Sequence, residues 1–213
     1  MSYKIVLQTQ CPVAFDSPDH LEPEGVMNDN STSLPLIREV ELDFFNAPLQ
    51  VLDLGCAGGA LVHDFIKRGH IAVGLEGSDF NLITLRAEWE FLAGKNLFSC
   101  DITRDFTLSI EDEAGRRPYL CDLITSWEVM EHLAESRLSV FFENIRKHLK
   151  PNGKYVGGVC LAGGTHHQSV FSKEVWEQEI LNKIPGLALR AYPYKNTGHD
   201  SASSYFFMLK NLA

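Results

Sequence analysis

The chain has 213 residues, of which 45% are hydrophobic and 22% are charged. This length suits one sizeable domain with a real core, and the formal net charge of −9 argues against a broad phosphate-binding face, which needs clustered lysine and arginine. The five cysteines show no CxxC spacing, and we find neither a signal-peptide pattern nor a membrane-length apolar stretch. We therefore expect a reduced protein of the cytoplasm, with no membrane contact and no nucleic-acid partner.

Residues 1–33 hold proline, glycine, aspartate and asparagine without hydrophobic periodicity. We interpret them as irregular, and as a flap in which Asn28, Asp29 and Asn30 could close over a ligand. Ser33 suits the N-cap of a helix over about 34–46, where apolar residues recur at helical spacing. The sequence therefore predicts two parts, an N-terminal flap and helix at 1–47 and a main domain at 48–213.

From residue 50 onward, short apolar strands alternate with amphipathic helices. The expected strands are 50–54, 70–77, 96–101, 121–127 and 154–160, and the expected helices are 60–69, 78–92 with Ser78 as cap, 135–149 and 172–184. Two further strands, 187–194 and 203–210, suit an antiparallel hairpin at one edge. This alternation predicts an α/β fold, with a Rossmann-like, doubly wound, seven-stranded and mostly parallel sheet.

The first of these strands ends in a glycine-rich turn, DLGCAGG, and Glu76 ends the second strand. In such sheets ligands bind beyond the carboxyl ends of the strands, and a carboxylate such as Glu76 can accept hydrogen bonds from both ribose hydroxyls of a nucleoside cofactor. Ala57 departs from the dinucleotide fingerprint, and Asp53 would bring negative charge close to a pyrophosphate. The cationic sulfonium and ammonium groups of S-adenosylmethionine fit an acidic residue there better.

Five segments in succession, VLDLGCAGGA, GLEGSD, CDITRDF, LITSWEVMEHL and LKPNGKYVGGV, resemble the motifs of class I S-adenosylmethionine-dependent methyltransferases. The resemblance covers about residues 48–160, in order and with similar spacing. It implies S-adenosylmethionine as cofactor and S-adenosylhomocysteine as product. It also implies a cofactor site made of Asp53, Gly55, Cys56, Ala57 and Gly59 at the methionine part, Glu76, Gly77 and Ser78 at the ribose, Asp101 and Ile102 at the adenine, and Ser126 and Trp127 beside the sulfonium.

The segment WEVMEHL places Glu128, Glu131 and His132 at the end of a strand, on one face if the chain turns helical there. Methyl transfer to a hydroxyl needs an aligned nucleophile and removal of a proton. Histidine can serve as that base, because its unperturbed pKa is about 6.5. In the alternative interpretation, Glu131 merely orients the next helix and His132 packs against it.

A third interpretation of the same residues is a divalent metal site. Glu128, Glu131 and His132, joined by His166 or His167 from the loop after the fifth strand, would offer carboxylate and imidazole ligands. The set resembles the Glu-x-x-Glu-His plus distant His arrangement of small-RNA 3′-terminal 2′-O-methyltransferases. A metal ion stays an open alternative, and no metal ligand is assigned.

We therefore predict an S-adenosylmethionine-dependent methyltransferase that O-methylates a small molecule or a sugar hydroxyl. Its candidate catalytic residues are His132, Glu131, Glu128 and His167. The alternatives are metal-assisted methylation of a diol or an RNA end, N-methylation of a small amine, a nucleotide-sugar or NAD-dependent enzyme, and a regulator that binds the cofactor without turnover. The sequence does not predict an oligomeric state.

Overall fold

The structure is a computed structural model that describes residues 3–184, 187–192 and 204–211. Its strands are β1 (Lys4–Thr9), β2 (Gln50–Leu54), β3 (Ile71–Glu76), β4 (Leu97–Ser99), β5 (Phe106–Asp112), β6 (Gly115–Pro118), β7 (Cys121–Trp127), β8 (Leu149–Cys160), β9 (Leu187–Ala191) and β10 (Ser204–Asn211). Its helices are α1 (Pro18–Leu21), α2 (Glu24–Asn28), α3 (Leu34–Asp43), α4 (Ala60–Lys67), α5 (Phe80–Thr84), α6 (Trp89–Leu92), α7 (Leu138–His148) and α8 (Lys173–Lys183), with the 3₁₀ turns η1 (Met130–His132) and η2 (Glu135–Arg137).

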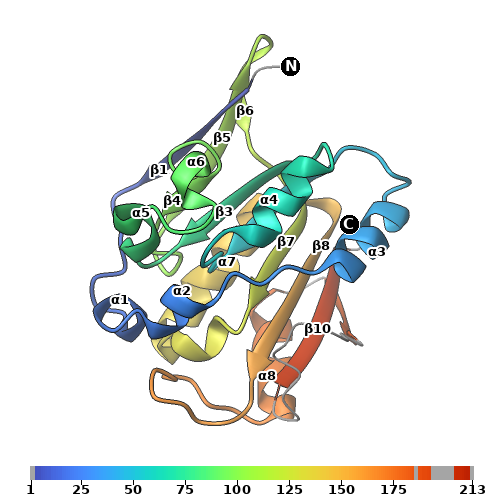
Figure 1. The fold of residues 1–213 in the computed structure, drawn as a ribbon. Helices are drawn as coiled ribbons and strands as arrows, with labels where there is room; N and C mark the ends of the chain where they lie inside the picture. The colour runs from blue at the N-terminus through green and yellow to red at the C-terminus, as the bar shows by residue number, and fades with distance from the viewer. Residues whose placement is uncertain (1–2, 185–186, 193–203, 212–213) are drawn as a thin grey trace.

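Seven strands form the main sheet in the order β4-β3-β2-β7-β8-β10-β9 (Figure 1). The first five are parallel to one another, whereas β10 is antiparallel to both β8 and β9. The predicted seven-stranded, mostly parallel sheet with an antiparallel edge is therefore confirmed. The parts of the predicted hairpin at 193–194 and at 203 lie outside the described residues.

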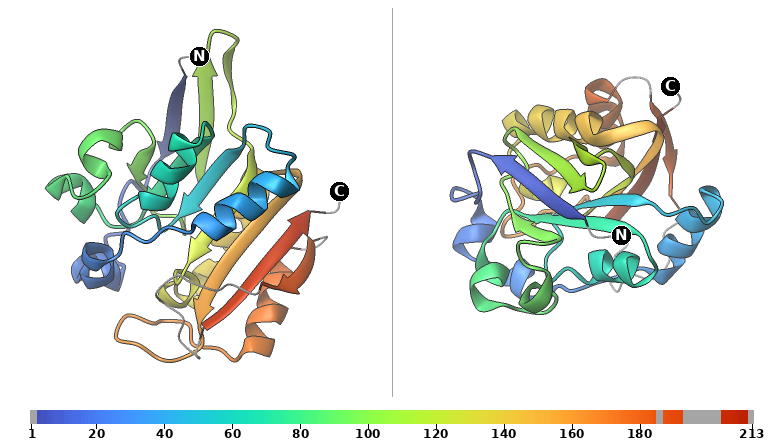
Figure 2. Two further views of the ribbon diagram at one scale, coloured as in Figure 1. Left: turned by 45° about the vertical axis from the view of Figure 1, so that its right-hand side comes forward. Right: turned by 90° about the horizontal axis from the view of Figure 1, so that it is seen from above.

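Helices cover both faces of this sheet (Figure 2). Successive strand residues point to opposite faces, and so the fully buried Leu52 packs in the core formed with α7 and α8, while Val51 packs in the core formed with α3 and α4. Strands buried on both faces read as continuous apolar runs, as β2 does. The chain winds outward from β2 to β3 and β4 and then returns to β7 on the other side of β2. A ligand cleft is expected at this reversal, beyond the strand ends.

The sequence suggested that residues 1–33 are irregular, and this prediction is wrong. Lys4–Thr9 forms β1, which pairs antiparallel with β5, and β5 pairs with β6 to complete a small three-stranded sheet. Figure 1 shows this sheet projecting from one end of the molecule, beside the N-terminus. The division between 1–47 and 48–213 stays a prediction, although β1 joins strands from the second part.

The single helix expected over 78–92 is also wrong, because two short helices stand in its place. Ser78 accepts a hydrogen bond from the backbone N–H of Phe80 (3.2 Å), but the N-cap of α5 is Asp79. Leu85, with φ of 50°, ends α5 in the left-handed region. The chain then turns back so that Trp89 is fully buried in α6. Burial of this indole overrides the helical pattern of the segment.

The other expected helices differ from expectation only at their ends, whereas α1 and α2 lie in the segment that was expected to be irregular. Ser33 caps α3 as predicted, accepting a hydrogen bond from the N–H of Leu36 (3.3 Å). The expected helix at 135–149 is the 3₁₀ turn η2 followed by α7. Among the described residues, no helix has the length and apolar character needed to cross a membrane.

Candidate functional site

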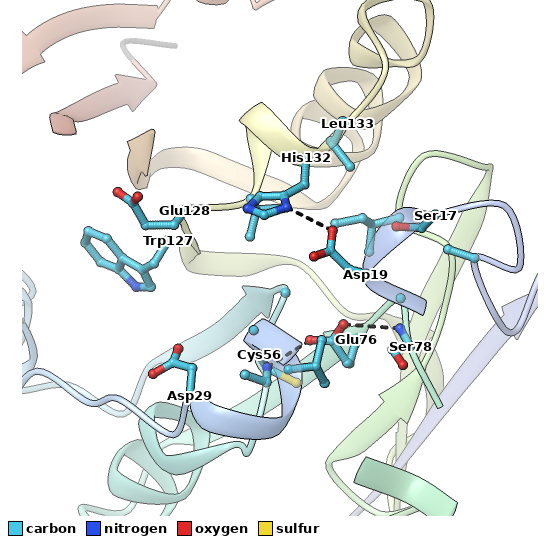
Figure 3. Close-up of a pocket in the computed structure, with 18 of the residues that line it drawn as sticks. Ser17, Asp19, Asp29, Cys56, Glu76, Ser78, Trp127, Glu128, His132 and Leu133 are labelled. Atoms are coloured by element: carbon cyan, nitrogen blue, oxygen red, sulfur yellow. Dashed lines mark hydrogen bonds and ion pairs between the residues drawn. The ribbon is translucent and has the colours of Figure 1, made fainter. Parts of the chain in front are cut away.

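A cavity of about 440 Å³ lies beyond the carboxyl ends of β2, β3 and β7. We call residues 14–33, which cross over it, the strap. The strap closes one side of the cavity and contributes residues such as Asp19, Val26 and Asp29 (Figure 3). A cavity of this size falls in the range of pockets that bind small molecules and cofactors.

The glycine-rich turn after β2 forms the floor of the cavity. The N–H groups of Gly55 and Cys56 both donate to the carbonyl oxygen of Leu75, which ties the turn to β3. Gly55 has a φ of 75°, and a Cβ added there would collide with the side chain of Val129. Of the residues predicted to hold the methionine part, Gly55, Cys56 and Ala57 line the cavity, whereas Gly59 does not. Gly59 instead adopts a left-handed conformation, with φ of 94°, at the N-cap of α4.

Glu76 stands at the end of β3, buried and facing the cavity. Its Oε2 accepts a hydrogen bond from the N–H of Ala57 (2.9 Å), and its Oε1 accepts one from the N–H of Ser78 (3.2 Å). Burial raises the pKa of this carboxyl, and these backbone donors offset only part of that effect. Glu76 therefore braces the glycine-rich turn and keeps further lone pairs available for a ligand hydroxyl. Gly77 and Ser78 line the cavity beside it.

Asp53 is a second buried carboxylate at the cavity. Thr125 donates a hydrogen bond from its Oγ1 to Asp53 Oδ1 (2.6 Å). Burial raises the pKa of Asp53 to about 7; the Thr125 hydrogen bond works against this shift, and the charges of Asp29 and Glu76 add to it. The site thus holds more negative charge than its own donors stabilise, and a cationic ligand would relieve this.

The adenine-side residues of the prediction also line the cavity. Asp101 is buried, and its Oδ1 accepts hydrogen bonds from the N–H and the Oγ1 of Thr103 (2.9 and 2.6 Å). Ile102 supplies an apolar wall next to it. Arg137 lines the same region and pairs with the strap residue Asp16. This contact with the strap was not predicted from the sequence.

The two residues predicted beside the sulfonium behave differently. Trp127 lines the cavity at the end of β7. Ser126 is fully buried and does not line it; its hydroxyl lies 2.7 Å from the hydroxyl of Tyr155. Ser126 therefore supports the sheet behind the cavity, because consecutive strand residues point to opposite sides.

Glu128, Glu131 and His132 do not share one helical face. Glu128 has a φ of 51°, and the chain then makes only the 3₁₀ turn η1. Glu128 and His132 consequently line the cavity, whereas Glu131 turns away from it and is fully buried. Oε1 of Glu131 accepts a hydrogen bond from the N–H of Cys160 (2.8 Å). Burial raises the pKa of Glu131 to about 8, helped by the charge of Glu128.

His132 is held by a residue that the sequence analysis did not single out. Its Nδ1 lies 2.9 Å from Oδ2 of Asp19 in the strap (Figure 3). Burial lowers the pKa of His132, but the carboxylates of Asp19, Glu131 and Glu128 outweigh it, so that the net shift is upward. Nothing in the local sequence around Asp19 signals this pairing, because it depends on the path of the strap across the cavity.

The two histidines of the loop after β8, His166 and His167, contact different residues. His166 Nδ1 lies 3.2 Å from Asp19 Oδ1, and its Nε2 lies 3.4 Å from Oε2 of Glu22. His167 packs edge-on against His132, with ring centroids 4.8 Å apart, and its Nδ1 lies 2.7 Å from the carbonyl oxygen of Ala162. His167 is the histidine that joins Glu131 and His132, with ligand atoms within 4.8 Å of one another. It does not line the main cavity.

Comparison with known proteins finds similarity to methyltransferases. Residues 52–155 match a family described as "Methyltransferase domain". The chain is 29% identical over 133 residues to the ubiquinone biosynthesis O-methyltransferase of Bartonella tribocorum, covering 58% of this chain and 50% of that protein. It is 30% identical over 105 residues to the protein of the same name in a Chelativorans species, covering 49% of this chain and 38% of that one. The chain thus spans half or less of the length of these curated relatives.

Solved structures share the fold at low sequence identity. The 1,6-didemethyltoxoflavin-N1-methyltransferase of Burkholderia thailandensis, solved with its substrate and S-adenosylhomocysteine, superposes with a TM-score of 0.63 at 14% identity, covering 92% of this chain and 84% of that one. The magnesium protoporphyrin IX methyltransferase of Synechocystis, also with S-adenosylhomocysteine, gives a TM-score of 0.58 at 14% identity, covering 92% and 96%. Residues 52–155 therefore match a methyltransferase domain, and the described chain shares the fold of these solved methyltransferases.

Proposed function

We propose that the chain binds S-adenosylmethionine in the main cavity and catalyses methyl transfer to a hydroxyl of a small molecule. The observation that carries the proposal is the pair of buried carboxylates, Asp53 and Glu76, at the end of adjacent strands. Burial raises the pKa of both carboxyls, and the hydrogen bonds that they accept offset only part of this effect. A ligand with an ammonium and a sulfonium would supply the missing positive charge.

The lining of the cavity argues against a dinucleotide. Of the described residues that line it, Arg137 is the only lysine or arginine, and it is paired with Asp16. A pyrophosphate would meet the carboxylates of Asp53 and Glu76 without a lysine to offset them. The residues present therefore fit S-adenosylmethionine better than NAD or a nucleotide sugar.

Each part of the cavity has a role in holding the cofactor. The turn Gly55–Ala57 and Asp53 would hold the methionine part, Glu76 would accept hydrogen bonds from the ribose hydroxyls, and Asp101 with Ile102 would hold the adenine. When bound, the cofactor supplies a methyl group on a positively charged sulfur. The chain must then position the acceptor and exclude water.

His132 is the residue best placed to take the proton of a hydroxyl acceptor. With Nδ1 paired to Asp19, its Nε2 is the nitrogen left to accept that proton. Asp19 acts through His132, since a carboxylate on one ring nitrogen fixes the tautomer and the orientation of an imidazole. Asp19 is thus a positioning residue supplied by the strap.

Calorimetry tests the cofactor assignment. We expect S-adenosylmethionine and S-adenosylhomocysteine to bind, NAD not to bind, and Glu76→Gln to weaken binding about tenfold or more. Asp101→Asn provides a second, independent variant, and the exposed Glu90→Gln on α6 is the control that should bind like wild type. Binding of NAD, or no binding of S-adenosylmethionine to wild type, would refute the assignment.

Turnover separates O-methylation from N-methylation of an amine. For a hydroxyl acceptor, His132→Asn should lower kcat about 100-fold or more, with cofactor affinity nearly unchanged. Asp19→Asn should also lower kcat, and by less. A neutral amine needs little help from a base, so full activity of His132→Ala would favour N-methylation instead.

A metal-assisted reaction is a second candidate, and one observation favours it. Glu131, His132 and His167 bring their ligand atoms within 4.8 Å of one another, and Oε2 of Glu131 is buried with no hydrogen-bond partner among the described residues. Carboxylate and imidazole ligands suit a divalent ion, which would hold and acidify a vicinal diol.

The expected partner is a small molecule, and the acidic cavity disfavours an RNA end. The free state of Cys11, Cys56, Cys100, Cys121 and Cys160 supports the cytoplasm as the proposed location. The name of the curated relatives, ubiquinone biosynthesis O-methyltransferase, supports oxygen rather than nitrogen as the acceptor atom.

A further inference from the structure

A second cavity, of about 550 Å³, lies between the strap and the loop that carries Thr165, His166 and His167. It shares lining residues with the cofactor cavity, among them Asp19, Asp29 and His132. The two spaces are therefore neighbours that meet at the proposed base. An acceptor in the second cavity can therefore reach His132 while the cofactor occupies the first.

The side chains that line the second cavity are all polar, apart from one glycine. They comprise three carboxylates, three imidazoles, one amide and two hydroxyls: Asp19, Glu24, Asp29, His132, His166, His167, Asn28, Ser31 and Thr165. Among the described residues that line it there is no aliphatic side chain, no lysine and no arginine. A long hydrocarbon tail would meet no aliphatic side chain there and could contact only imidazole rings and the methylene groups of polar side chains, whereas hydroxyl groups would find hydrogen-bond partners on these same side chains.

The charge of the second cavity is negative. Asp19 already faces both His132 and His166, and Glu22 adds a further carboxylate at His166. Glu24, in the first turn of α2, and Asp29, at its C-cap, contribute two more carboxylates. Acceptors with phosphate or carboxylate groups would be repelled, whereas hydroxyl groups find many hydrogen-bond acceptors.

We infer that the second cavity is the acceptor subsite, and that its acceptor is a small polyhydroxylated molecule without negative charge, of the neutral-sugar type. This inference rests on the proposed function and deepens it. It predicts discrimination against both sugar phosphates and long-chain phenols, with Glu24 as a residue that determines the charge preference.

The experiment measures S-adenosylhomocysteine formation with three sets of probes: neutral monosaccharides, the matching sugar phosphates, and a long-chain alkylcatechol. We expect wild type to prefer the neutral sugars by about tenfold or more in kcat/KM. Glu24→Lys should reduce that preference severalfold by raising kcat/KM for the sugar phosphates, whereas Glu90→Lys, the same charge change on exposed α6, should leave it unchanged.

A preference of wild type for the phosphates or the alkylcatechol, no turnover of any neutral sugar, or equal effects of Glu24→Lys and Glu90→Lys would overturn the inference. Calorimetry with S-adenosylmethionine on the same samples distinguishes a failure of the subsite inference from a failure of the proposed function. Cofactor binding with the wrong acceptor preference refutes only the subsite, and absence of cofactor binding refutes the proposed function itself.

Discussion

Thr125 donates a hydrogen bond to Asp53 between two neighbouring parallel strands, with 2.6 Å from Oγ1 to Oδ1. Both residues are buried, and they lie where the direction of winding reverses in the sheet. One neutral hydroxyl stabilises a buried carboxylate only in part, so the pKa of Asp53 rises to about 7. The protein therefore keeps, at the main cavity, a carboxyl that is half protonated near neutrality.

Asp53 should make the ligand-free protein less stable as the pH rises. The unfolded chain releases this proton near the ordinary pKa of 3.8, whereas the folded chain holds it up to about pH 7. The contribution of Asp53 to the free energy of unfolding is therefore fully present below about pH 4, and it is lost as the pH rises from there to about pH 7. Between pH 5 and pH 7.5 the loss from this group is about 3 kcal/mol, measurable by urea unfolding at the two pH values.

Two variants control this prediction. Asp53→Asn should lose less stability than wild type between the same pH values, because it cannot ionise. Thr125→Val should lose more, since removal of the donor raises the pKa of Asp53 further. The raised pKa of Glu76 acts in the same direction in all three proteins. An equal pH dependence in wild type and Asp53→Asn would contradict the pKa assignment.

Gly58→Ala should detach the strap from the glycine-rich turn. A Cβ at Gly58 would collide with the side chain of Asn30, whose Oδ1 accepts from the N–H of Ala60 (3.0 Å) and whose Nδ2 donates to Glu88 (2.9 Å). We expect a loss of about 1–3 kcal/mol in stability, as for other overpacked sites, and several times weaker S-adenosylhomocysteine binding by calorimetry. Gly163→Ala is the control, because a Cβ there meets no atom of the described residues within 4 Å. Equal binding by the two variants would show that the strap does not depend on this contact.

Ala57→Gly should be tolerated and even stabilising. Ala57 has a φ of 43°, a left-handed conformation that costs an L-residue about 1–2 kcal/mol. Glycine removes this cost but gives the unfolded chain about 0.4–1 kcal/mol of additional freedom. The free energy of unfolding in urea should therefore rise by up to about 1 kcal/mol. Ala60→Gly, at the start of helix α4, should lower it by about 0.5 kcal/mol; a loss in both variants would mean that the Ala57 methyl contributes packing that outweighs its strain.

The residues of the main sheet could be predicted from the sequence because each buried strand is a local apolar run. The small sheet could not be predicted in that way, since Ile5 pairs with Ile110 across more than a hundred residues. The alternation of Phe106, Leu108 and Ile110 with more polar residues did carry a signal for β5. Without its partner strand, that signal does not reveal a sheet.

The same contrast holds within the site. Asp53, Glu76 and Asp101 stand at strand ends, and parallel topology brings strand ends together, so their convergence on one cavity was predictable. The position of Asp19 was not predictable, because its contact with His132 depends on how the strap crosses the cavity. The common face expected for Glu128, Glu131 and His132 was wrong, because a left-handed Glu128 and a 3₁₀ turn replace the α-helix that the spacing assumed.

Glu131 provides the sharpest test of the metal-assisted alternative. Within the part of the chain that the structure describes, its Oε2 is buried without a hydrogen-bond partner, beside the imidazoles of His132 and His167. If this cluster binds a divalent ion, calorimetry with Mn²⁺ should show binding to wild type at one site and at least tenfold weaker binding to Glu131→Gln, which keeps the shape of the side chain but has a poorer ligand. Glu135→Gln, on the exposed turn η2 outside the cluster, should bind like wild type. Binding is measured without any acceptor, so the result does not depend on which substrate the enzyme uses. Equal affinities for the three proteins would exclude the cluster as the metal site and would leave His132 as the proposed base.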